Sequence, residues 1–152
     1  MKILFLTDNF PPEINAPANR TYEHARAWVR SKNVRVTIIT SFPNHPYGKI
    51  YKGYKNKLYS KEKIDGITVI RVWTYMSSNK GVYKRIFDYI SFSIMSFFVG
   101  IFQKSDIIIA TSPQFFTTWS AFLLSKIKRV PWIFELRDLW PESIKAVGAI
   151  NN

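Results

Sequence analysis

The chain has 152 residues, 47% apolar and 16% aromatic, which fits one folded domain and excludes a disordered chain. It carries 22 Lys and Arg against 10 Asp and Glu, a formal charge of +12. This surplus favours anionic partners: nucleic acid, phosphorylated ligands or an anionic membrane face. Cysteine is absent, which excludes disulfides and thiolate metal sites. The apolar run after Lys2 is too short for a signal-peptide core, so we expect a cytoplasmic location, with a membrane surface still possible.

The first forty residues predict a strand, a helix and a second strand. The apolar run of Lys2–Thr7 reads as a buried strand and leads into a loop with three prolines. A helical pattern over Ala18–Ser31 follows, with an apolar face made of Tyr22, Ala25, Trp28 and Val29. The β-branched residues over Val34–Thr40 predict the next strand. Parallel strands need a crossover, so these elements form a right-handed βαβ unit. The proline loop then either lies at a ligand crevice or only shapes a surface connection.

Residues 41–63 read as a long loop, with or without a hairpin. Between Tyr47 and Lys63 there are six lysines, four tyrosines and one acid. Three interpretations stay open: a solvated loop, a face for a membrane or anionic ligand, and a nucleic-acid-binding segment. The candidate residues for a membrane or acceptor face are Lys49, Lys52, Lys55 and Lys57.

After a strand predicted at Ile67–Thr74, the most apolar segment of the chain covers Ile86–Phe102. As a helix it measures about 25 Å, shorter than the roughly 30 Å hydrocarbon core of a bilayer. Small residues at Ser93, Ser96 and Gly100 form one stripe. The pattern favours a helix packed on a sheet, with either lipid or another helix on its other side.

The remaining chain predicts a strand at Asp106–Ala110, a helix from Ser112 to about Lys128 and a strand at Val130–Leu136. The residues of this helix expected to point inward are Phe116, Trp119, Phe122, Leu123 and Leu124. Five parallel strands in this arrangement predict a Rossmann-like, doubly wound α/β sheet with strand order 3-2-1-4-5. The loops after the first, fourth and fifth strands would line its crevice. Their polar residues are Asn15, Arg20, Gln114, Arg137, Asp138 and Glu142.

Several kinds of site are absent from the sequence. It has no GxGxxG or Walker motif, no GxSxG elbow and no Asp-x-Asp pair. His24 and His45 are isolated in sequence, which is typical of structural histidines. We therefore expect no metal and no bound cofactor.

Three segments resemble the N-terminal half of retaining, metal-independent glycosyltransferases of family 4. They are LTDNFPPEINAPANRTYEHARAW, DIIIATSPQFFTTW and ELRDLWPESIKAVGA. The chain is most similar to the fucosamine-type transferases that build bacterial surface polysaccharides such as lipopolysaccharide or capsule. The resemblance implies a GT-B enzyme with two Rossmann-like domains. Residues 1–152 would be the acceptor-side domain, ending before the domain that binds the nucleotide-sugar, and would be inactive alone.

The resemblance also implies partners and roles. The donor would be a nucleotide-sugar and the acceptor a lipid-linked glycan at the inner face of the cell membrane; nucleic acid is not expected. Asp138 and Arg137 would be the catalytic pair, although Arg137 stands where many members have His. The substrate-binding set would be Asn15, Ala16, Arg20, Gln114 and Glu142, with Asn15-Ala16 replacing the common Gly-Gly. Two alternatives remain: a non-catalytic module that binds an anionic lipid or polyphosphate, and a basic nucleic-acid-binding domain.

Overall fold

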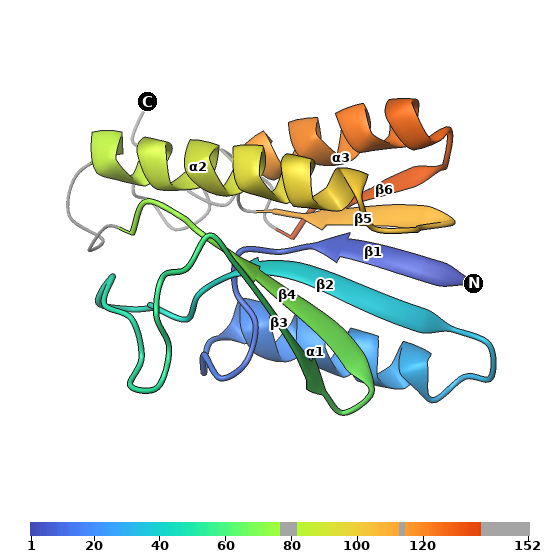
Figure 1. Cartoon of the computed structure of the whole chain (residues 1–152), viewed down its shortest axis with the longest axis horizontal. Helices are drawn as coiled ribbons and strands as arrows, with labels where there is room; N and C mark the ends of the chain where they lie inside the picture. The colour runs from blue at the N-terminus through green and yellow to red at the C-terminus, as the bar shows by residue number, and fades with distance from the viewer. Residues whose placement is uncertain (77–81, 113–114, 138–152) are drawn as a thin grey trace, which may run out of the picture.

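Six strands form one sheet in the spatial order β3-β4-β2-β1-β5-β6 (Figure 1). The computed structural model describes residues 1–76, 82–112 and 115–137. The strands are β1 (Lys2–Leu6), β2 (Arg35–Ser41), β3 (Tyr59–Ile64), β4 (Ile67–Val72), β5 (Ile107–Thr111) and β6 (Trp132–Glu135). The helices are α1 (Ala16–Val29), α2 (Val82–Ile101) and α3 (Phe115–Lys128).

The five strands expected from the sequence are parallel and lie side by side in the predicted order. The Rossmann-like α/β class is therefore confirmed. The overall strand order differs by β3, an antiparallel edge strand at the end of the segment predicted to be a long loop with or without a hairpin. A tight turn at Asp65-Gly66, where φ is 48° and 84°, pairs β3 with β4. Lysines at 61 and 63 keep this polar edge strand from pairing with another chain.

One face of the sheet is covered by α1. Phe5, Val36 and Ile38 from the strands lie in a buried cluster there, together with Phe10 and Ala25. The predicted apolar face of α1 packs against this cluster through Tyr22, Trp28 and Val29. Asn15 caps the helix, since its Oδ1 accepts the N–H of Ala18 at 2.8 Å.

The other face is covered by α2 and α3, which lie side by side (Figure 1). Their contact is built from the small residues of α2. The hydroxyls of Ser93 and Ser120 are 2.6 Å apart, and a Cβ on Gly100 would lie only 2.6 Å from Cδ1 of Leu124. Of the two partners left open for the small-residue stripe, lipid or a second helix, the structure therefore supplies the helix α3.

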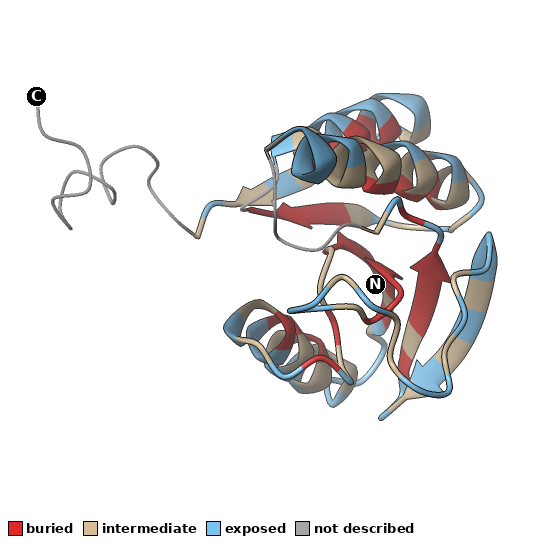
Figure 2. Cartoon of the chain, turned by 90° about the vertical axis from the view of Figure 1, so that its left-hand side faces the viewer, coloured by how far each residue is buried: buried red, intermediate tan, exposed pale blue. Residues whose placement is uncertain are grey.

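The outer surfaces of α2 and α3 remain exposed, whereas buried residues concentrate in the strands (Figure 2). The sequence predicted that Trp119 and Leu123 point inward, and this is wrong: they are 65% and 44% exposed. The reason is that α2 takes the flank of α3 carrying Ser120 and Leu124, so neighbouring positions turn outward. Among the described residues, no helix has both the length and the apolar character needed to span a bilayer.

Candidate functional site

The carboxyl ends of the parallel strands carry a cluster of charged side chains around Glu135, the last residue of β6. Its Oε1 lies 2.8 Å from Nη2 of Arg20 and 3.8 Å from Nδ1 of His24, both on α1. Its Oε2 lies 3.7 Å from Nε of Arg137, two residues further along the chain. One carboxylate, 18% exposed, thus lies between two guanidinium groups. Water screens the contact with Arg137, which is 8% exposed, less than it screens the contact with Arg20, which is 47% exposed.

Arg137 is held in place by two more contacts. Its backbone N–H donates to Oγ of Ser112 at the end of β5, over 2.8 Å, and its Nη2 donates to Oγ1 of Thr21 over 2.8 Å. The side chain of Arg137 is only 8% exposed. Arg20, from the predicted substrate-binding set, and Arg137, one of the two predicted catalytic residues, therefore contact the same carboxylate, although 117 positions separate them in the sequence.

The start of α1 places the other predicted residues of the first loop. The amide of Asn15 is engaged, because Oδ1 accepts from Ala18 and Nδ2 donates to Oδ1 of Asn9 over 3.1 Å. Ala16 is exposed at the first helical position. Pro17 has no N–H, so in the described first turn only the N–H of Ala16 remains for a ligand.

A buried carboxylate supports this loop from behind. Glu13 is 2% exposed, and its Oε1 accepts the backbone N–H groups of Asn44 and His45 at 2.8 and 2.9 Å. Burial raises the pKa of Glu13, partly offset by these hydrogen bonds. Glu13 thereby joins the proline loop to the start of the loop that carries the candidate lysines.

The segment from Tyr47 to Leu58, which precedes β3, is called the basic loop and lies at the surface. Lys49, Lys52, Lys55 and Lys57 are all exposed. The backbone between them is fixed by hydrogen bonds, including Nδ2 of Asn56 to the carbonyl of Thr74 over 2.8 Å. Tyr75 follows Thr74 in the chain, and its ring lies 6.4 Å, centroid to centroid, from the ring of Phe87 on α2. The basic loop and the first half of α2 therefore form neighbouring parts of one surface.

Three predicted site residues, Gln114, Asp138 and Glu142, lie outside the described residues. The sequence reasoning missed Glu135 and Thr21, and it set His24 aside as isolated. A usable signal was present in α1, where Arg20 and His24 are four positions apart and so lie on one face of the helix. The described residues contain no group of three or more His, Cys, Asp or Glu that could hold a metal ion.

Comparisons with known proteins give the fold alone. No protein-family model matches the chain, and no curated protein matches it. Two crystal structures of the C-terminal domain of a hydrogenase from Pyrococcus furiosus are similar, with TM-scores of 0.51 and 0.53. Their sequences are 17% and 13% identical to this chain. The alignments cover 89% and 88% of this chain and 90% of each domain. At such low identity this likeness supports the α/β architecture and no particular activity.

Proposed function

We propose that the chain is the acceptor-side domain of a retaining, metal-independent glycosyltransferase. In this proposal the complete enzyme moves a sugar from a nucleotide-sugar donor to a lipid-linked glycan acceptor in bacterial surface polysaccharide synthesis. The observation that carries the proposal is the contact of Arg20 and Arg137 with one carboxylate, Glu135. These residues come from two of the three segments that resemble the transferase family, and they meet where α/β sheets bind ligands.

The chemistry of this cluster suits a substrate with phosphate and hydroxyl groups. A guanidinium stays protonated and cannot act as a general base, but it can donate two parallel hydrogen bonds to a phosphate or a sugar diol. Oε2 of Glu135 is buried and accepts no hydrogen bond from the described residues, and its nearest charged neighbour is Nε of Arg137 at 3.7 Å. The surrounding charge is net positive, with two arginines against one carboxylate.

The roles within the proposal follow from these properties. Arg137 and Arg20 hold an anionic group of the substrate, Glu135 orients both of them, and Ala16 offers its N–H near the donor. In the sequence Gln114 follows β5 and Asp138 and Glu142 follow β6, and these three residues are proposed to contact the sugars. The protein would work at the inner face of the cell membrane, with the basic loop and α2 towards the lipid.

The test is an activity assay with the complete protein that contains this chain. Membrane lipid extracts would be incubated with a panel of labelled nucleotide-sugars, and transfer to lipid would be followed by chromatography. We expect transfer with at least one donor. We also expect Glu135→Gln to lower kcat/KM by about 10–100-fold, because two arginines lose their common partner. Exposed Lys61 on β3 gives the matched control, Lys61→Gln, which should keep full activity. A complete protein that binds anionic lipid and transfers no sugar would instead favour the non-catalytic binding module.

A further inference from the structure

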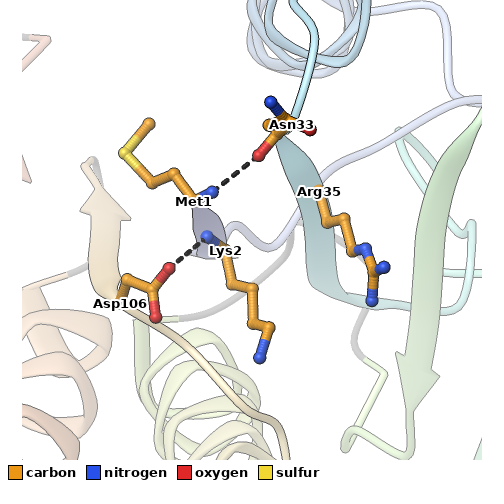
Figure 3. Close-up of a pocket in the computed structure, with 5 residues that line it drawn as sticks. All are labelled: Met1, Lys2, Asn33, Arg35 and Asp106. Carbon is orange, nitrogen blue, oxygen red and sulfur yellow. Dashed lines mark hydrogen bonds between the residues drawn. The ribbon is translucent and has the colours of Figure 1, made fainter.

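Two shallow hollows adjoin each other at the amino-terminal edge of the parallel strands, the opposite edge from the Glu135 cluster. One has a volume of about 330 Å³ and is lined by Met1, Lys2, Asn33, Arg35 and Asp106 (Figure 3). The other has a volume of about 300 Å³ and is lined by Lys2, Arg35, Thr37, Gln103 and Lys104. Because Lys2 and Arg35 line both hollows, the two form one basic recess.

The two cations that line both hollows, Lys2 and Arg35, are neighbours because their strands are paired in the sheet. Lys2 on β1 and Arg35 on β2 are register partners. Ile3 and Val36, the next residues on each strand, lie in the α1 cluster, so both cations project from the opposite face, where α2 ends at Ile101. Like charges on adjacent strands repel one another, and this lowers stability unless an anion lies between them.

The described lining of the recess holds one carboxylate, Asp106. Oδ2 of Asp106 accepts the backbone N–H of Lys2 at 2.7 Å, which ties this acid to the strand end (Figure 3). Within the described part of the chain, Lys2, Arg35 and Lys104 make no ion pair within 4.0 Å. Three side-chain cations, Lys2, Arg35 and Lys104, therefore line the recess with one carboxylate, Asp106. The surplus charge is therefore available to a ligand.

We propose that this recess binds a phosphate-type oxyanion. Arg35 supplies a planar pair of donors, Lys2 and Lys104 supply ammonium groups, and Thr37 and Gln103 add neutral donors. Charge-assisted hydrogen bonds of this kind are the strong ones in proteins. A volume of about 300 Å³ suits a small anion such as pyrophosphate or a phosphomonoester, or the phosphate of a lipid headgroup. The site is independent of the Glu135 cluster and of the proposed glycosyl transfer.

The probe is pyrophosphate, titrated into the full chain at low ionic strength and followed by calorimetry, with any purification tag at the C-terminus. We expect saturable binding that Arg35→Gln weakens about tenfold or more, because one bidentate contact is lost. Lys61→Gln, on the distant edge strand β3, is the matched control and should bind like the wild type. A thermal unfolding transition of Arg35→Gln shows that the variant is folded. Pyrophosphate should raise the Tm of the wild type more than the Tm of this variant.

Vesicles separate the two sources of phosphate. If Arg35→Gln also reduces binding to vesicles containing phosphatidic acid, the natural ligand is a lipid headgroup; if only pyrophosphate binding falls, it is a soluble phosphate compound. Either result supports the site. An absence of saturable pyrophosphate binding, or equal affinities of wild type and Arg35→Gln, would overturn it. Neither result depends on whether the complete protein transfers a sugar, so the two proposals can fail separately.

Discussion

Nε of Arg71, on β4, lies 2.6 Å from Oε1 of Glu62, on the edge strand β3. The side chain of Arg71 is 1% exposed, and the same guanidinium donates to the carbonyls of Ser41 and Pro11. Its Cζ also lies 4.9 Å from the centre of the Tyr54 ring. One buried side chain therefore joins the edge strand, the end of β2, the proline loop and the basic loop.

Replacing this arginine by an apolar residue should be strongly destabilising. We expect Arg71→Met to lower the free energy of unfolding by about 3–5 kcal/mol, because Glu62 and two carbonyls lose their partner. Urea denaturation followed by circular dichroism measures the change. Glu62→Gln is the control and should cost less, because the amide oxygen of Gln can still accept from Nε of Arg71 and the two carbonyls keep their donor. A loss below about 1 kcal/mol for Arg71→Met would show that Arg71 does not hold these segments together.

Gly100 is predicted to be required by the close approach of α2 and α3. A Cβ at this position would lie 2.6 and 3.3 Å from the two methyl groups of Leu124, which is fully buried. Gly100→Ala should therefore destabilise the protein by about 1–3 kcal/mol, although alanine is the better helix former by about 1 kcal/mol. In a double-mutant cycle with Leu124→Ala, the two changes should show a coupling of at least about 0.5 kcal/mol. Strict additivity would contradict the proposed clash.

Glu13 should make stability fall as the pH rises. Burial raises its pKa above the ordinary value of 4.5, so between these two pKa values the folded protein keeps a proton that the unfolded chain has released. The free energy of unfolding therefore decreases with increasing pH through this window. Glu13→Gln keeps the oxygen that accepts from Asn44 and His45 and removes the ionisation, so this slope should disappear. Chemical denaturation across about pH 4 to 8 measures it.

The matched control for Glu13 is Glu23 on α1, whose side chain is 64% exposed. Glu23→Gln should leave the pH slope of the wild type unchanged. If the wild type and Glu13→Gln show the same slope, Glu13 is not the group responsible.

The basic loop and α2 are expected to bind anionic membranes. Each lysine close to such a surface contributes about 1 kcal/mol, and exposed Tyr83, Phe87 and Phe98 on α2 add apolar contact. The protein should co-sediment with phosphatidylglycerol vesicles at low salt. A variant with Lys49, Lys52, Lys55 and Lys57 changed to Glu should lose most of this binding. At 1 M salt, where the screening length is about 3 Å, the vesicle binding that the wild type retains should depend on Phe87 and Phe98.

Two further variants control this experiment. Lys61→Glu with Lys63→Glu changes charge on β3 and should weaken vesicle binding far less than the four loop substitutions. Phe98→Ser should remove only the salt-resistant part. If the wild type does not bind anionic vesicles at low salt, the surplus positive charge of the loop has another purpose.

Strand periodicity was sufficient to predict the parallel part of the fold. Runs such as residues 35–41 and 107–111 are apolar and β-branched because both faces of the sheet are covered, and such runs are easily recognised. The strand β3 escaped prediction because its sequence, YSKEKI, is polar and alternates only weakly. An edge strand with one solvated face has little need of apolar residues, so its pairing with β4 depends on tertiary context.

The candidate site was predicted only in part. Arg20 and Arg137 were chosen because they lie in loops that follow parallel strands, and topology alone brings such loops together. Glu135 was missed because it belongs to a strand, and sequence gives no indication that a strand-end carboxylate faces α1. The outward orientation of Trp119 was missed for a similar reason. The flank of α3 that becomes buried is the one that contacts α2, and the sequence of α3 alone does not show which flank this is.

The position of β1 between β2 and β5 determines when this protein can fold during synthesis. Ile3 can pair with Val36 early in synthesis. Ile3 can pair with Ile107 only after over a hundred further residues have been synthesised. Until α3 leaves the ribosome, the buried residue Leu124 cannot cover the α2 face of the sheet. A nascent chain that stops before this point exposes Leu4, Leu6 and the apolar side of α2 together. Sequence separation of this size slows folding, and such an intermediate is prone to aggregate or to need a chaperone.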